Sequence, residues 1–163
     1  MENEQMFVEA TEKDALSIID LRHRIWDTTY RGIYPDKMID DFDWAWHKEK
    51  ELFRINDPAY SVYLIRKDAQ DIGYLTMLQA DVVILQSLYI ISAYQRQGIG
   101  RTAFDFIKAH CREHGAESFI CHCVPENLNA RAFYERMGGR VIGADLANEE
   151  PWQNSVTYRF DLI

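Results

Sequence analysis

The stretch YQRQGIGRTAF, residues 94–104, has the residue types of a turn that binds an anion. The glycines at 98 and 100 lack side chains that would block the backbone, so successive N–H groups can point at one spot. The turn precedes a helix-like segment, and the unpaired amides and dipole of a helix N-terminus favour negative charge. Arg96 and Arg101 add positive charge. A pyrophosphate would suit this turn, and an ordinary glycine-rich turn is the alternative.

Read from Gly98, the same stretch also matches the dinucleotide-binding pattern G-x-G-x-x-A. In that fold the strand runs almost directly into the first glycine, whereas six residues, SAYQRQ, separate the expected strand from Gly98 here. Several βα units should follow the pattern, and only one clear unit does. A dinucleotide-dependent oxidoreductase therefore stays open as a minor alternative, with Glu126 as the ribose-binding acid. A P-loop is disfavoured because no Gly-Lys-Ser/Thr follows.

Size and composition indicate a globular chain. The 163 residues, 47% of them apolar and 27% charged, suit one domain, which we expect to span 1–163. The apolar runs are too short for a membrane span, and the N-terminus lacks the features of a secretion signal. Three cysteines argue against a disulfide framework, so we expect a cytoplasmic protein. The net charge of −8 disfavours nucleic-acid binding and mildly favours a cationic partner such as an amine, but ordinary solubility is the favoured explanation.

Hydrophobic periodicity predicts the elements that position the turn. Thr11 and Asp14 form a variant capping box at the start of the first helix, along which Ile18, Leu21 and Ile25 follow the helical period. Asn127 is a good N-cap for the last helix. The order predicts an α+β fold with a mixed, mostly antiparallel sheet of about six or seven strands and about four flanking helices. The predicted strands are 6–11, 60–68, 71–79, 82–92, 118–124 and one or two in the tail that ends at 162. The predicted helices are 11–30, 36–57 (in one or two pieces), 99–115 and 127–137.

Two motifs together resemble the GNAT family of acetyl-CoA-dependent N-acetyltransferases. The first resembles its acetyl-CoA motif Q/R-x-x-G-x-G/A and the second its N-x-x-A-x-x-F-Y segment, carried here by Gln95, Gly98, Gly100, Asn127, Ala130, Phe133 and Tyr134. The motifs come in the family's order and at its usual spacing, and the predicted element order is also that of the family. The resemblance covers nearly the whole chain. It is most specific at 87–138 and weaker at 32–58 and 140–155.

The resemblance implies an enzyme that moves the acetyl group of acetyl-CoA to a primary amine by direct attack in a ternary complex. Its strands 82–91 and 118–124 would be a central parallel pair that splays apart, and the pantetheine arm would pair with 88–90. The N–H of Ile90 would donate to the thioester carbonyl. The implied cofactor-binding residues are Leu88, Tyr89, Ile90, Gln95, Arg96, Gln97, Gly98, Ile99, Gly100, Arg101 and Asn127. No covalent acyl-enzyme is expected, because neither motif contains cysteine.

The same resemblance makes Tyr134 the catalytic general acid, with its hydroxyl near the coenzyme sulfur. A tyrosine has a pKa near 10 and a thiol near 8.5, so full proton transfer in water is slightly uphill. A hydrogen bond to the developing thiolate is enough to lower the barrier. The alternative is that Tyr134 is a core residue, since it shares helical spacing with Ala130, Phe133 and Met137.

The general base is left open. Many family members carry a Glu on the central strand, where this chain has Gln86 and Ser87. The other candidates are Asp81, His122, Glu126 and a water chain to solvent. Because the Glu is missing, a catalytically silent acyl-CoA-binding sensor is the rival hypothesis. Gly139 is a second departure, since the family usually has Phe there; we expect looser final strands or room for a partner residue.

The segment Cys121-His122-Cys123 invites a metal interpretation. Alternation along a strand puts His122 on the face opposite the two cysteines, and the sequence shows no second pair of ligands. We therefore predict no metal site, and interpret Cys111 as helix packing.

The segment IWDTTYRGIYPDKMID resembles one bacterial subgroup in which aromatic residues border the acceptor site. We expect Trp26, Tyr30, Tyr34 and Trp152 to contact the substrate, among nearby acidic residues. Aromatic faces and carboxylates suit a cation, so a polyamine-like or other small amine is attractive and a peptide amine stays possible. The alternative is that the tryptophans anchor helices and the acids face water. A homodimer is expected by family habit alone.

Overall fold

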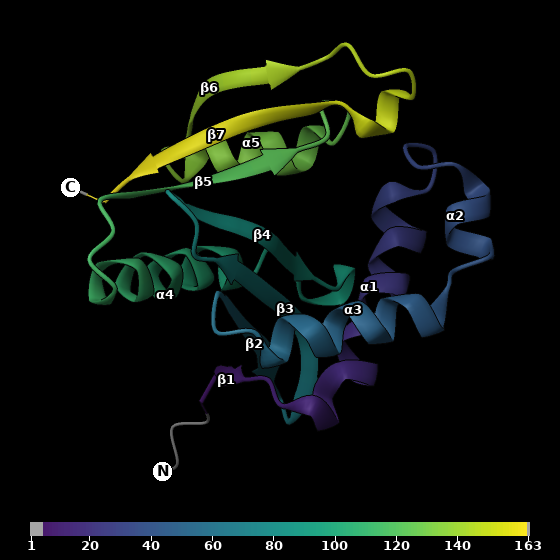
Figure 1. The fold of residues 1–163 in the computed structure, drawn as a ribbon, viewed down its shortest axis with the longest axis horizontal. Helices are drawn as coiled ribbons and strands as arrows, with labels where there is room; N and C mark the ends of the chain where they lie inside the picture. Colours follow the sequence, from purple (N-terminus) through teal and green to yellow (C-terminus); the bar gives the residue numbers. More distant parts are fainter. Residues whose placement is uncertain (1–4, 163) are drawn as a thin grey trace. The chain divides into compact units, whose positions relative to one another are not determined.

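The computed structural model of the chain describes residues 5–162, and Figure 1 shows the path of the chain. The strands are β1 (Phe7–Glu9), β2 (Tyr60–Lys67), β3 (Gln70–Leu78), β4 (Val83–Ile90), β5 (Ser118–Cys123), β6 (Arg140–Asp145) and β7 (Ser155–Asp161). The α-helices are α1 (Ala15–Ile25), α2 (Asp36–Asp40), α3 (Trp44–Asn56), α4 (Ile99–Glu113) and α5 (Leu128–Arg136). The short helical turns are η1 (Glu12–Asp14), the π-helical η2 (Trp26–Tyr30), η3 (Ser92–Tyr94) and η4 (Pro151–Gln153). Among these described residues, none of the helices is both long and apolar enough to span a bilayer.

The seven strands are hydrogen-bonded in the order β1-β2-β3-β4-β5-β7-β6. Strands β1 and β2, β2 and β3, β5 and β7, and β6 and β7 pair antiparallel. Strand β4 pairs parallel with β5, and Val83–Leu85 lie opposite Phe119–Cys121. The predicted α+β class, with a mixed and mostly antiparallel sheet and a central parallel pair, is confirmed. The second helical region consists of two pieces, α2 and α3.

Contacts along the chain define two compact units within the described residues. The first contains residues up to 78 together with 86–95, and the second contains 79–85 together with 96–162. Strand β4 therefore contributes its first residues to the second unit and its remaining residues to the first. A single domain over 1–163 stays a prediction.

The core of the first unit lies between α1 and the β2–β3 hairpin. The predicted helical face of α1 is confirmed, since Ile18, Leu21 and Ile25 are all buried. Ile18 and Leu21 pack with Leu64 and Tyr74 from the hairpin. The predicted capping box is also confirmed, because the Asp14 carboxylate accepts from the Thr11 N–H at 2.8 Å. It starts the turn η1, and α1 itself begins at Ala15.

The core of the second unit is aromatic. The rings of Phe119 on β5 and Phe160 on β7 stack at 4.8 Å, and Phe104 on α4 packs against Phe160 at 5.0 Å. A Cβ at Gly139 would lie 2.7 Å from the Phe160 ring. The ring of Phe160 thus takes the space that a side chain at 139 would fill, which agrees with the expected room for a partner residue. Looser final strands stay a prediction.

Candidate active site

The glycine turn forms the N-terminus of α4, in the second unit. Gly98 is the N-cap with φ of +80°, and Arg96 also has positive φ, +62°. Left-handed residues within a turn produce the backbone shape that gathers N–H groups around an anion. The first helical hydrogen bond runs from the Thr102 N–H to the Gly98 carbonyl at 3.1 Å. The N–H groups of residues 99–101 precede that bond, at the positive end of a fifteen-residue helix.

The two glycines of the turn are required for different reasons. A Cβ at Gly98 would meet no atom within 4 Å, so the positive φ is what favours glycine there. A Cβ at Gly100 would lie 2.9 Å from the Phe133 ring of α5. Gly100 therefore permits close packing of the two helices that carry the two motifs. The sequence reasoning assigned Gly100 only to the open backbone and missed this contact.

The last residues of β4, in the first unit, are held from two sides. Leu88, Tyr89 and Ile90 are half-buried. The Gln95 side-chain amide donates to the Ile90 carbonyl at 2.8 Å. On the neighbouring strand, a Cβ at Gly73 would lie 2.0 Å from the Tyr89 carbonyl oxygen, so β3 approaches β4 closely there. The predicted pantetheine strand thus has a fixed backbone, and Gln95 contributes to fixing it.

Asn127 begins α5 in the second unit. Its side-chain oxygen accepts from the Ala130 N–H at 3.2 Å, and the residue is buried. The predicted N-cap is confirmed. A role for Asn127 in holding the cofactor stays a prediction.

Tyr134 lies on α5 in an aromatic environment within the second unit. Its ring centroid is 5.7 Å from that of Tyr158 and 6.2 Å from those of Phe104 and Phe160. The side chain is half-buried. These contacts fix the orientation of the ring and are compatible both with a catalytic hydroxyl and with a core residue.

The base candidates differ in burial. Asp81, Gln86, His122 and Glu126 are exposed, and Ser87 is half-buried. The Nδ1 of His122 is 2.8 Å from the Thr157 hydroxyl on β7. The burial and contacts of these candidates do not identify one of them as the general base.

Alternation along β5 is confirmed, because Cys121 and Cys123 are buried and His122 is exposed. Within residues 5–162, no group of three or more His, Cys, Asp or Glu side chains is arranged to hold a metal. Burial raises the pKa of Cys121 to about 12 and those of Cys111 and Cys123 to about 11. These thiols are protonated at neutral pH and are poor nucleophiles.

Three of the four predicted substrate residues meet in the first unit. The rings of Tyr30 and Tyr34 stack at 4.4 Å, and Trp26 packs edge-on against Tyr34 at 5.2 Å. Tyr30 also contacts Tyr89 of β4, with centroids 6.3 Å apart. We call Trp26, Tyr30 and Tyr34 the aromatic wall. Trp152 lies in η4 of the second unit, and its contact with the substrate stays a prediction.

A buried polar network was not predicted from the sequence; it meets the aromatic wall where the Trp26 and His47 rings lie 5.3 Å apart. Arg22 on α1 donates to the Tyr74 hydroxyl at 3.0 Å and to Glu51 on α3 at 2.5 Å. It also lies 3.2 Å from His47 Nδ1. Burial, followed by the charge of Arg22, lowers the pKa of His47 to about 4. His47 is thus neutral at pH 7, and its Nδ1 accepts because a guanidinium can only donate.

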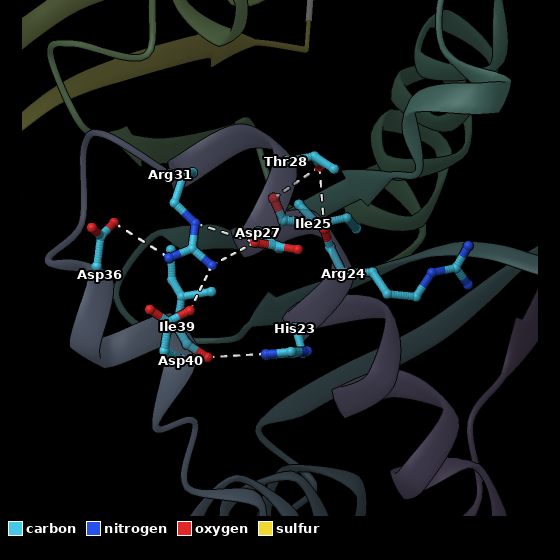
Figure 2. A network of polar contacts seen from close by, with 9 residues as sticks. All are labelled: His23, Arg24, Ile25, Asp27, Thr28, Arg31, Asp36, Ile39 and Asp40. Carbon is cyan, nitrogen blue, oxygen red and sulfur yellow. Dashed lines mark hydrogen bonds and ion pairs between the residues drawn. The ribbon is translucent and has the colours of Figure 1, made fainter.

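A second, exposed network joins η2 to α2 (Figure 2). Arg31 follows η2 and pairs with Asp27, Asp36 and Asp40. The hydrogen bonds that it donates to Asp40 and Asp27 raise the pKa of Arg31 above its usual value. His23 on α1 adds a contact between its Nε2 and the Ile39 carbonyl at 3.0 Å. The sequence shows several acidic residues in this region, but it does not reveal which of them pair with Arg31.

Comparisons with known proteins agree on one family. The model of the acetyltransferase (GNAT) family matches residues 19–139. The uncharacterized N-acetyltransferase in the pepI 3′ region of Lactobacillus delbrueckii subsp. lactis is 23% identical over 141 residues, which cover 80% of this chain and 82% of that protein.

Two solved structures resemble the fold of this chain. PaiA N-acetyltransferase from Thermoplasma acidophilum, in complex with coenzyme A, has a TM-score of 0.81 at 19% identity, covering 95% of this chain and 97% of its own. A putative streptothricin acetyltransferase from Bacillus anthracis, in complex with acetyl coenzyme A, has a TM-score of 0.61 at 18% identity, covering 67% of this chain and 66% of its own.

Proposed function

Because this chain belongs to the acetyltransferase (GNAT) family, we propose that it transfers the acetyl group of acetyl-CoA to a primary amine. The observation that carries the proposal is the exposed turn at the N-terminus of α4, with left-handed Arg96 and Gly98. This backbone suits the pyrophosphate of a coenzyme. Two structural neighbours bound to coenzyme A or acetyl coenzyme A support the choice of cosubstrate. The proposal takes 1–163 as one catalytic domain.

We propose that each cofactor-binding residue serves one part of acetyl-CoA. The amides of residues 96–101 and the charges of Arg96 and Arg101 hold the pyrophosphate. The backbone of residues 88–90 pairs with the pantetheine arm. Asn127 keeps the start of α5 in place and holds the pantetheine. These roles follow from the family motifs and agree with the local geometry of each unit.

The proposed reaction is a direct transfer. The amine nitrogen attacks the thioester carbonyl carbon, while the Ile90 N–H stabilises the carbonyl oxygen. The carbon–sulfur bond then breaks, and the Tyr134 hydroxyl donates a hydrogen bond or a proton to the departing sulfur. The proton that the amine loses goes to water or to one of the base candidates. The raised pKa values of the three buried cysteines disfavour an acyl-cysteine intermediate.

The proposed acceptor is a cationic amine, such as a polyamine or another small amine, or the amine of a peptide. Trp26 and Tyr34 are half-buried and would contact the cation, while buried Tyr30 stacks on Tyr34 and supports it. The exposed carboxylates of Asp36 and Asp40 lie close to this wall. Tyr30 contacts Tyr89, the residue before Ile90, so the wall is linked to the strand proposed to hold the thioester. Trp152 is a further proposed contact.

Turnover on an amine panel tests this function. The wild-type protein is mixed with acetyl-CoA and a diamine, a polyamine or a lysine peptide. Free thiol and acetylated amine are then measured by a thiol reagent and by mass spectrometry. We expect both products in equal amounts, and only when acetyl-CoA and amine are present together.

Two results of the same assay would contradict the proposal. Binding of acetyl-CoA without acetylation of any amine would identify the silent sensor that the missing Glu suggests. An acetyl group left on the protein after incubation with acetyl-CoA alone would contradict direct transfer.

A further inference from the structure

Arg31 uses all three of its guanidinium nitrogens to join η2 and α2 (Figure 2). Arg31 Nε and Nη2 contact the Asp27 carboxylate of η2 at 3.2 and 2.5 Å. Its Nη1 contacts Asp36 at 3.3 Å, and its Nη2 contacts Asp40 at 2.9 Å. Asp36 and Asp40 are the first and last residues of α2, so Arg31 connects both ends of that helix to η2.

Arg31 lies in the chain between Tyr30 and Tyr34, the two tyrosines whose rings stack. The Ile33 and Tyr34 N–H groups donate to the Tyr30 carbonyl at 2.9 and 2.8 Å, and an isolated bridge pairs Arg31 with Tyr34. Gly32 has a φ of +91° within this tight turn. The turn places the Tyr30 and Tyr34 rings 4.4 Å apart and nearly parallel. A change in the position of Arg31 therefore changes the geometry of the stack directly.

We propose that Arg31 is a positioning residue for the amine acceptor. By joining α2 to η2, it sets the separation and tilt of the Tyr30 and Tyr34 rings, and so controls how well the amine is held. The inference rests on the proposed function, because it takes the aromatic wall as the acceptor surface.

The exposure of the carboxylates that pair with Arg31 distinguishes a positioning role from a stabilising one. The three carboxylates are between 54% and 72% exposed, and exposed ion pairs contribute little to stability. The segment that the contacts hold, η2, is a π-helix, a form that is rare and is frequent at functional sites. The three ion pairs of Arg31 thus hold the local geometry of η2 and α2 and add little to the overall stability of the fold.

The direction in which Arg31→Ala changes the amine KM also distinguishes a positioning role from a purely electrostatic one. Removing the guanidinium makes this region more negative by one charge. If the acids merely attracted a cationic amine, Arg31→Ala would lower the KM for the amine. If Arg31 positions the wall, the same variant raises that KM.

Steady-state kinetics of Arg31→Ala and Arg31→Lys test the proposal, with an amine that the wild type acetylates. We expect Arg31→Ala to raise the amine KM by roughly tenfold or more, since small displacements of positioning groups have large kinetic effects. The KM for acetyl-CoA and the midpoint of thermal unfolding should stay near wild type. Arg31→Lys should be intermediate, because an ammonium cannot reproduce the planar fork.

Arg24→Ala is the matched control, because Arg24 is an exposed arginine of α1 with one ion pair to Asp20 at 4.0 Å. It should leave the amine KM unchanged. An unchanged or lowered amine KM in Arg31→Ala would overturn the inference, as would a drop in the unfolding midpoint far larger than that of Arg24→Ala. If the wild type and Arg24→Ala acetylate no amine at all, the proposed function itself has failed.

Discussion

Tyr134→Phe should lower kcat for amine acetylation by roughly 10²- to 10⁴-fold, the range typical of losing a general acid. The phenylalanine ring keeps the contacts that Tyr134 makes with Phe104, Tyr158 and Phe160. Only the hydroxyl is lost, so the departing thiolate loses its proposed hydrogen-bond donor. Acetyl-CoA affinity and the unfolding midpoint should change little. Thiol release at saturating substrates, together with thermal unfolding, measures both quantities.

Tyr158→Phe is the matched control for that result. The Tyr158 hydroxyl accepts from Arg131 at 3.1 Å and donates to Glu135 at 3.2 Å, and the residue is fully buried. Its loss should cost about 0.5–1.5 kcal/mol of stability, the range for an ordinary hydrogen bond, because half-buried Arg131 and exposed Glu135 can bind water instead. The kcat of the folded protein should remain that of the wild type. A wild-type kcat in Tyr134→Phe would instead make Tyr134 a core residue.

Glu51→Ala should reduce the free energy of unfolding by about 3–5 kcal/mol, the range for removing one partner of a buried ion pair. Glu51 is fully buried, and Arg22 is 8% exposed. Burial lowers the pKa of Arg22, but Tyr74 and Glu51 raise it by more, so the net direction is upward and Arg22 stays charged. Without Glu51, the hydrogen-bond partners that remain for Arg22 among residues 5–162 are the neutral Tyr74 and His47.

Urea denaturation of Glu51→Ala beside Glu49→Ala measures this effect. Glu49 is an exposed residue of the same helix, and its replacement should change stability by less than about 0.5 kcal/mol. The double variant Arg22→Met/Glu51→Leu should recover much of the loss, since apolar side chains remove the unpaired charge. A loss below about 1 kcal/mol in Glu51→Ala would show that water reaches Arg22.

Local features of this chain were predictable because their determinants are close in sequence. Thr11 and Asp14 are three residues apart, and Asn127 caps the helix that follows it directly. The buried positions of α1 and the alternation on β5 follow from the 3.6 and 2.0 periods of helix and strand. The two motifs led to the family in the same way, since each lies within a few residues.

Features that depend on long-range register were not predictable. Arg22 and Glu51 are separated by 29 residues, and no local pattern pairs them. Gly139 lies where the family usually has Phe, and the sequence did not reveal that the ring of Phe160 on β7 packs against it. Similarly, three of the predicted substrate residues meet in one wall, but the sequence did not reveal the arginine that holds that wall. Periodicity predicts the face of a helix or strand on which a residue lies, but not which residue of another element packs against it.

The most direct test of the central claim is thermal unfolding with and without acetyl-CoA, on the wild type, Gly98→Ala and Gly98→Glu. A ligand at 100 times its dissociation constant adds about 2.7 kcal/mol of stability. Both variants share the strain of a side chain at φ of +80°, and neither side chain has a Cβ contact within 4 Å. Only Gly98→Glu places a carboxylate where the pyrophosphate is proposed to bind. The account predicts that acetyl-CoA raises the midpoints of the wild type and Gly98→Ala, but not that of Gly98→Glu. Equal stabilisation of all three proteins, or a shift of the wild type with NADH alone, would contradict it.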